Sequence, residues 1–169
     1  MNKISLWYFF GGIFIYISKR NSTLTETDRS INNENFIKDK LIEYKDYFDN
    51  IYKGIDDNIM LDIEQRKAIL IDEDYNMIIA GAGSGKTTTI SAKVKYLVEK
   101  LNIKEEEIVV ISFTNKAVSE LKERINRDFN LNILICTFHH LAISLVKDKK
   151  SVCTNSYDIL KYFFYNVLY

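Results

Sequence analysis

The chain has 169 residues, of which 47% are hydrophobic and 27% charged, and this excludes a disordered protein and indicates one domain with a buried core. Its 23 basic and 23 acidic side chains cancel, so any nucleic-acid site must be local rather than part of a global basic field. The two cysteines, Cys136 and Cys153, lack the spacing of a metal site and favour a reducing, cytoplasmic compartment.

Residues 1–20 form an apolar N-terminal segment, whose composition differs from that of the rest of the chain. Residues 4–17 are almost wholly apolar and rich in aromatic side chains. A membrane-spanning helix needs about 20 apolar residues, and the Gly11-Gly12 pair weakens a helix. Two interpretations stay open: a buried or misassigned leader segment, and a membrane anchor through residues 4–17 with Lys19 and Arg20 on the cytoplasmic side.

Residues 21–60 are expected to form a polar linker and then a lead-in helix. Ser, Thr, Asn, Glu and Asp dominate residues 21–35, which is typical of a linker or loop. Apolar side chains then recur in steps of four and three, and this spacing predicts an amphipathic helix that ends near Gly54. The apolar positions are Ile37, Leu41, Tyr44, Phe48, Ile51 and Ile55.

Asp62 and Gln65 predict the start of the next helix, because an acidic cap followed three residues later by glutamine is a capping box. The Gln65 amide also carries one acceptor and two donors, which can pair with the N6/N7 edge of adenine. The two roles do not exclude each other. Further on, residues 69–71 precede Asp72-Glu73 and mimic a catalytic strand, but the apolar spacing continues the helix and predicts a helix end and turn.

Residues 80–89 read Ala-Gly-Ala-Gly-Ser-Gly-Lys-Thr-Thr-Thr, which is a nucleoside triphosphate loop with alanine at its first glycine position. A short apolar run at 75–80 predicts a strand before the loop, and helical spacing follows it. Lys86 can reach the β- and γ-phosphates, and the Thr87 hydroxyl can ligate Mg²⁺. Both are candidate catalytic residues. The candidate nucleotide-binding residues are Gln65, Gly81, Ala82, Gly83, Ser84, Gly85, Lys86, Thr87 and Thr88.

Two further strand and helix pairs follow the loop. The strands are expected at 108–113 and 133–136, and the helices at 115–128 and 141–146. Alternation of strand and helix predicts an α/β fold with a parallel sheet and flanking helices. Residues 61–150 would form this nucleotide-binding domain, and residues 151–169 would begin a helical insertion.

Polar and aromatic side chains follow both of these strands, at the sheet edge where open α/β sheets bind ligands. Phe113 can stack on a base, while Thr114 and Asn115 can cap the next helix or bond a phosphate. The alternative is a core phenylalanine followed by an ordinary helix cap. The third strand is followed by Thr137, Phe138 and His139, whose imidazole can donate to a phosphate or a base.

Four segments in this order, at 61–68, 81–88, 111–117 and 137–142, resemble the N-terminal part of the Rep/UvrD-like superfamily 1 DNA helicases. Residues 41–48 and 137–145 look most like the helicase IV branch. The resemblance implies a partial RecA-like P-loop NTPase domain that uses ATP and Mg²⁺, with adenine selected by Gln65. It implies 3′–5′ helicase or translocase activity on single-stranded DNA. The DNA contacts it implies are Phe113, Thr114, Asn115, Thr137, Phe138 and His139.

Other parts of the helicase machinery are not found in this chain. No apolar strand ending in Asp-Glu follows the loop, and neither arginine fingers nor a second RecA-like domain is recognised. We therefore expect an amino-terminal fragment of a DNA helicase that is inactive alone. Two alternatives stay open: a membrane-tethered nucleotide-binding protein without unwinding activity, and an inactive remnant.

Overall fold

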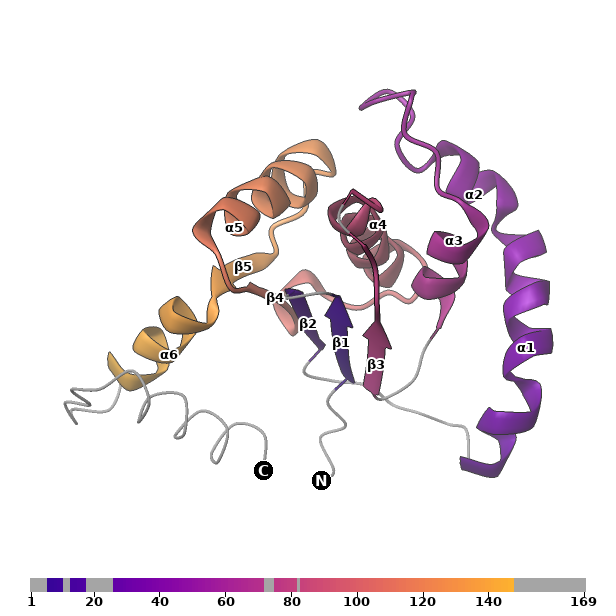
Figure 1. Ribbon diagram of the computed structural model, residues 1–169, viewed down its shortest axis with the longest axis horizontal. Coiled ribbons are helices and arrows are strands. Elements are labelled where there is room, and N and C mark those ends of the chain that lie inside the picture. Colours follow the sequence, from indigo (N-terminus) through magenta and orange to yellow (C-terminus); the bar gives the residue numbers. More distant parts are fainter. Residues whose placement is uncertain (1–5, 11–12, 18–25, 72–74, 82, 148–169) are drawn as a thin grey trace.

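The computed structural model describes the backbone of residues 6–10, 13–17, 26–71, 75–81 and 83–147, and the side chains of residues 35–71, 77–81 and 83–144. Helices and strands alternate after residue 60, as expected (Figure 1). In chain order the elements are β1 (Leu6–Phe10), β2 (Ile13–Ile17), α1 (Glu26–Glu43), α2 (Lys45–Asn50), α3 (Ile63–Leu70), β3 (Tyr75–Ile78), α4 (Lys86–Glu99), η1 (Glu105–Glu107), β4 (Ile108–Ser112), α5 (Asn115–Lys122), η2 (Glu123–Asp128), β5 (Leu134–Thr137) and α6 (Phe138–Lys147).

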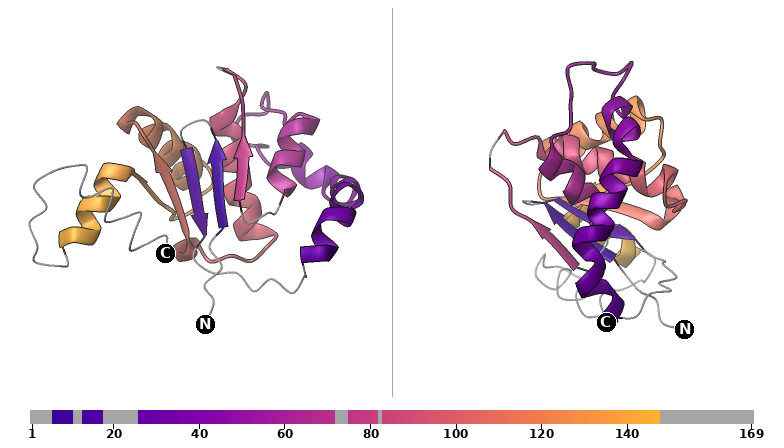
Figure 2. Two further views of the ribbon diagram at one scale, coloured as in Figure 1. Left: turned by 60° about the horizontal axis from the view of Figure 1, so that its bottom comes forward. Right: turned by 90° about the vertical axis from the view of Figure 1, so that its right-hand side faces the viewer.

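The described strands form one mixed sheet in the order β3-β1-β2-β4-β5. Pairing is parallel between β1 and β3 and between β4 and β5, whereas β2 is antiparallel to both of its neighbours. It follows that β3, β1, β4 and β5 point the same way (Figure 2). The prediction of an α/β fold is confirmed, and the three strands expected in a parallel sheet, β3, β4 and β5, do run parallel. The antiparallel β2 was not predicted, and it makes the whole sheet mixed.

The apolar N-terminal segment supplies the two central strands. Two five-residue apolar runs flank Gly11-Gly12, and this is the spacing of a β-hairpin. Phe9 pairs with Phe14 across the hairpin, and the outer edges of the two strands pair with β3 and β4. Neither interpretation of this segment predicted strands. In the part of the chain that the structure describes, no helix is long and apolar enough to cross a membrane.

The core lies against one face of the sheet, where α4 is shared by two apolar clusters. The first cluster joins Ile90, Val94 and Leu97 of α4 to β4, β5 and the helix formed by α5 and η2. The second joins Ala92 and Tyr96 of α4 to α2 and α3. Because α4 is packed against both clusters, its first residues, which follow the glycine loop, are held in a fixed position.

Several element boundaries differ from the expected ones. Helix α1 begins at Glu26, inside the stretch expected to be a linker, and the helical path breaks at Tyr44 before α2. The last turn ends at Asn50 rather than near Gly54. The helix after β4 changes to π geometry at Glu123. The expected insertion at 151–169 lies outside the described residues.

Candidate nucleotide and nucleic-acid sites

The glycine loop follows β3 and ends where α4 begins. Gly85 is the N-cap of α4 with a φ of +74°, and Gly83 has the same φ. This left-handed conformation is open to glycine without steric cost. A Cβ on Gly85 would also lie 2.7 Å from Nε2 of Gln65. The positive φ therefore favours glycine at this position, and a Cβ here would also displace the end of the Gln65 side chain.

Lys86 is bonded to the carbonyl groups of its own loop. Its Nζ donates to the carbonyl oxygens of Ala80, at 3.3 Å, and of Gly81. The Ser84 hydroxyl also donates to Gly81, at 2.9 Å. These carbonyls hold a cation at the helix N-terminus, where backbone N–H groups and the helix dipole favour an anion. Ala82 lies outside the described residues.

Gln65 connects α3 to the loop. Its Oε1 accepts from the Asp62 backbone N–H at 3.0 Å, and Oδ1 of Asp62 accepts from the Gln65 N–H at 2.8 Å, so the predicted capping box is confirmed. The Gln65 Nε2 donates to the carbonyl of Ser84 at 3.2 Å. One amide N–H and one carbonyl lone pair remain after these bonds. The adenine-binding role of Gln65 stays a prediction.

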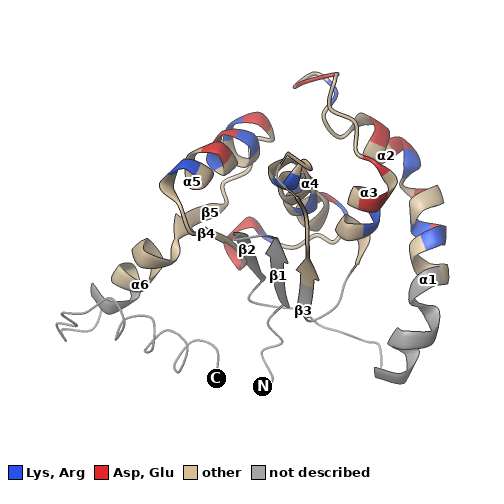
Figure 3. Ribbon diagram, viewed as in Figure 1, with Lys and Arg blue, Asp and Glu red and all other residues tan. Residues whose placement is uncertain are grey.

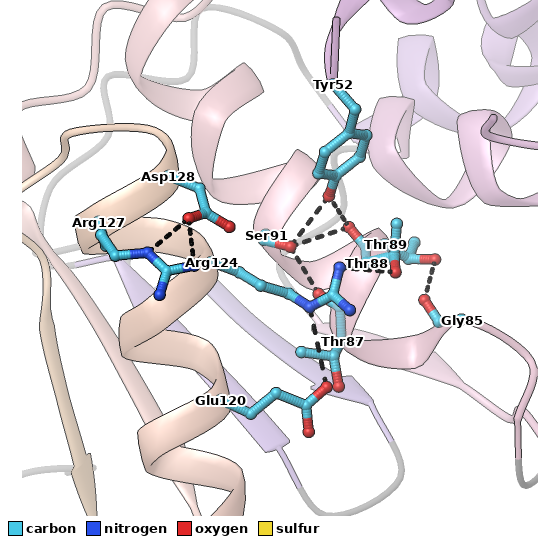
Figure 4. A network of polar contacts seen from close by, with 10 residues as sticks. All are labelled: Tyr52, Gly85, Thr87, Thr88, Thr89, Ser91, Glu120, Arg124, Arg127 and Asp128. Carbon is cyan, nitrogen blue, oxygen red and sulfur yellow. Dashed lines mark hydrogen bonds and ion pairs between the residues drawn. The ribbon is translucent and has the colours of Figure 1, made fainter. Parts of the chain in front are cut away.

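The Tyr52 hydroxyl and the Arg124 guanidinium both contact Thr88 in the first turn of α4 (Figure 4). The Tyr52 hydroxyl donates to the Thr88 carbonyl at 2.6 Å and lies 3.0 Å from the Ser91 hydroxyl. From η2, Nη1 of Arg124 lies 3.5 Å from Oγ1 of Thr88. Burial raises the pKa of Tyr52 to about 12, so its hydroxyl remains a donor at neutral pH.

The aromatic pair Phe113 and Phe138 stands at the carboxyl ends of β4 and β5. Ser112 of β4 pairs with Thr137 of β5 in the sheet, so the residues that follow them, Phe113 and Phe138, lie side by side. The two ring centroids are 5.5 Å apart. Phe113 is 65% exposed, and the alternative that it is a core residue is therefore wrong. A large apolar ring that faces solvent is available to stack on a ligand.

The polar residues beside this pair cap the two helices that follow. The Thr114 hydroxyl accepts from the Ala117 backbone N–H at 3.2 Å, and the Thr137 hydroxyl accepts from the His140 N–H at 3.2 Å. The side chains of Asn115 and His139 are exposed. The capping role expected for Thr114 is thus confirmed, and each threonine still has acceptor capacity for another donor.

The loop and the aromatic pair share one edge of the sheet, because β3, β4 and β5 all point toward it. Three strand spacings separate β3 from β4, which is about 14 Å at the usual spacing between neighbouring strands. Basic and acidic side chains alternate along α5 and η2 on this side (Figure 3). This helix therefore carries no uniform positive field.

The sequence of the described site is matched by a model of the UvrD/REP helicase N-terminal domain over residues 61–162. That stretch includes the capping box, the glycine loop, the aromatic pair and the helices that support them. The chain belongs to the UvrD/REP helicase N-terminal domain family. The narrower likeness to the helicase IV branch stays a prediction.

Relatives in this family are 32–44% identical to the chain over alignments of 88 to 110 residues. The chain is similar to the ATP-dependent DNA helicase Rep of Buchnera aphidicola, at 38% identity over 52% of this chain and 14% of the relative. It is also similar to the ATP-dependent DNA helicase PcrA of Leuconostoc citreum, at 39% identity over 50% of this chain and 12% of the relative. The ATP-dependent DNA helicase UvrD1 of Mycobacterium leprae is 32% identical over 54% of this chain and 12% of the relative. The aligned part of the chain thus spans only 12–14% of the length of these helicases.

Sequence reasoning missed three residues that support the family site. Tyr52 and Arg124 reach Thr88 from elements that are distant in sequence. Lys93 is fully buried and donates to the carbonyls of Ile69 and Ile71. A lysine within the apolar stripe of α4 was the available signal for Lys93, whereas Tyr52 and Arg124 carry no motif that marks them.

Proposed function

We propose that this chain is the ATP-binding part of an ATP-dependent DNA helicase, and that single-stranded DNA crosses the same sheet edge beside the nucleotide. The observation that carries the proposal is the common edge at which the glycine loop and the exposed Phe113–Phe138 pair both follow parallel strands. The helicase names of the relatives support the reaction class, and a RecA-like domain with 3′–5′ polarity is part of the proposal.

The residues of the loop fit a nucleoside triphosphate. Gly83 and Gly85 turn the backbone without a Cβ, and the cation of Lys86 already lies among loop carbonyls that phosphate oxygens can replace. Thr87, the next residue of α4, would supply a hydroxyl to Mg²⁺. Bound ATP would supply the free energy for movement along DNA, while these residues bind and orient it.

The exposed ring of Phe113 would stack on one face of an unpaired base, and His139 would donate a hydrogen bond to the DNA strand. Stacking of a base on an aromatic side chain contributes about 1–3 kcal/mol and tolerates any sequence. Such a contact fits single strands, because their bases are not already stacked within a duplex. We further propose that hydrolysis by this chain alone is weak, because no apolar strand ending in Asp-Glu, which would supply the carboxylate that activates water, is recognised after the loop.

The nucleotide half of the proposal is tested with Lys86→Ala. We expect the substitution to lower the affinity for Mg-ATP by about tenfold or more, because it removes the side-chain cation expected on the terminal phosphates. Isothermal titration calorimetry measures this affinity. Lys104→Ala removes an exposed lysine elsewhere and serves as the control. Equal ATP affinity in Lys86→Ala and the wild type would refute the nucleotide site.

The DNA half is tested with Phe113→Ala and His139→Ala, measured by the fluorescence anisotropy of a labelled oligothymidylate. We expect Phe113→Ala to weaken binding by roughly 5- to 150-fold, which corresponds to the loss of one stacked base. Phe36→Ala removes another exposed aromatic ring, far away in α1, and should change nothing. If binding survives both substitutions at the sheet edge unchanged, this assignment of the DNA site fails.

A further inference from the structure

Helix α3 is attached at one end to the glycine loop and at the other end to the helix that follows this loop. At the N-terminal end of α3, Nε2 of Gln65 donates to the carbonyl of Ser84 at 3.2 Å. At the C-terminal end, Nζ of Lys93 in α4 donates to the carbonyls of Ile69 at 2.5 Å and Ile71 at 2.8 Å. The two helices lie side by side (Figure 1). Hydrogen bonds therefore fix both ends of α3.

The bonds from Lys93 set the position of α3 on α4 more sharply than apolar packing can. Ile69 and Leu70 of α3 are buried in one cluster with Ala92 and Tyr96 of α4. Apolar contacts are non-directional, so they tolerate a small slide or rotation of one helix on the other. Hydrogen bonds from an ammonium depend on distance and angle, and here one fully buried ammonium binds two carbonyls. Lys93 thus holds α3 in register on α4.

The side-chain amide of Gln65 is held in one orientation. Its Oε1 accepts from the backbone N–H of Asp62 at 3.0 Å, and its Nε2 donates to the backbone carbonyl of Ser84. If the amide turned end for end, oxygen would face oxygen and N–H would face N–H, and both bonds would be lost. Adenine presents a donor at N6 and an acceptor at N7, whereas guanine presents two acceptors. An amide with a fixed orientation can therefore distinguish the two bases.

We propose that Lys93 is a positioning residue for base selection, because it keeps α3 at the place on α4 where the Gln65 amide reaches both the loop and the base. Gln65 lies about one helical turn before Ile69 in this short helix, so a shift at the C-terminal end displaces the amide. The inference rests on the proposed nucleotide site and on the adenine-binding role predicted for Gln65. It adds a buried residue that acts on this role from the opposite end of α3.

The test compares the affinities of the full chain for Mg-ATP, Mg-GTP and Mg-tripolyphosphate, which has the phosphates and no base, by isothermal titration calorimetry. We expect the wild type to prefer ATP over GTP by roughly 5- to 150-fold, the range for one good bidentate pair. Lys93→Met should reduce this preference to less than about threefold and change the tripolyphosphate affinity by less than about twofold, because the loop is unaltered. Lys93→Arg keeps a cation with several donors and should restore most of the preference.

Lys95→Met is the matched control, because it makes the same substitution two positions further along α4. Lys95 is partly buried, and its Nζ donates to the carbonyl of Ile51, the C-cap of α2, at 3.2 Å. It makes the same kind of contact with a helix that carries no predicted base-binding residue. We expect Lys95→Met to keep the preference of the wild type. Gln65→Ala is the positive control and should lose the preference as Lys93→Met does.

Retained tripolyphosphate binding shows that each variant is folded. The inference is overturned if Lys93→Met keeps the preference while Gln65→Ala loses it, or if Lys95→Met loses as much preference as Lys93→Met. It is also overturned if Lys93→Met weakens all three ligands alike, since a purely structural role has this effect. If the wild type does not distinguish ATP from GTP, or Gln65→Ala still does, the adenine-binding role fails and the inference with it, while the phosphate loop stands. If the wild type binds none of the ligands, the proposed nucleotide site itself fails.

Discussion

Lys93 lies in an environment that is unusual for a lysine. Its side chain is fully buried, and Nζ donates to the carbonyls of Ile69 at 2.5 Å and Ile71 at 2.8 Å. Both carbonyls lie at the end of α3, where the helix dipole favours a cation. Because Gln65 is in α3 and the loop opens α4, Lys93 joins the two helices that flank the proposed nucleotide site.

We expect Lys93→Met to lower the free energy of unfolding by about 2–4 kcal/mol. Methionine keeps much of the buried volume but leaves the two carbonyls without this donor, at about 1–3 kcal/mol for each unsatisfied group. Urea denaturation followed by circular dichroism measures the loss. Lys104→Met, at an exposed lysine, should stay within about 0.5 kcal/mol of the wild type. A Lys93→Met protein as stable as that control would contradict the role.

At the scale of elements, the β1–β2 hairpin joins the two parallel parts of the sheet. β1 covers the edge of β3, and β2 covers the edge of β4. Without the hairpin both strands would expose unpaired N–H and C=O groups, which promote association between chains. The hairpin also sets the separation between the loop that follows β3 and the aromatic residue that follows β4.

Deletion of residues 1–20 should therefore convert the protein to soluble aggregates or insoluble material. The physical reason is the exposure of the β3 and β4 edges together with the apolar surface around them. Size-exclusion chromatography with light scattering reports the state of the chain. Deletion of residues 1–5 keeps both strands and is the matched control. A monomeric protein with an unchanged circular dichroism spectrum after the longer deletion would show that the hairpin is dispensable.

At the scale of the whole molecule, α4 couples the two apolar clusters. One cluster contains the sheet strands β4 and β5, and the other contains the helices that precede the loop. Helix α4 contributes residues to both, so neither cluster can open without disturbing the other. The family match over residues 61–162 includes this helix and its partners. We expect one cooperative unfolding transition for the described part of the chain.

Leu97→Ala tests this coupling, because Leu97 is fully buried in α4. We expect a loss of about 2–5 kcal/mol from the transfer and cavity costs of the truncated side chain. Fluorescence of Trp7, the one tryptophan of the chain, and far-UV circular dichroism should report the same midpoint in both proteins. Met60→Ala, at a 75% exposed side chain, is the control. A Trp7 transition at lower denaturant would show that the hairpin unfolds separately.

Local patterns were enough to predict the loop, the capping box and the strand–helix alternation. Lys86 and Gly85 lie within one short motif, and Asp62 caps a residue only three positions away, so sequence spacing and contact coincide. The same holds for Thr114, whose hydroxyl meets a backbone N–H three residues later. Short-range hydrogen bonding and the periodicity of apolar residues decide these features, and both are visible without coordinates.

Contacts between distant segments were decided only by the tertiary structure. The apolar N-terminal run pairs with strands about 70 and 95 residues later, and its Gly11-Gly12 pair was used only as an argument against a helix, not as a signal of a hairpin. Tyr52, Lys93 and Arg124 reach partners 22 to 36 residues away. The register of β4 on β5 places Phe113 beside Phe138. Strand order and helix packing follow from burying surface across the whole chain, and no local pattern encodes them.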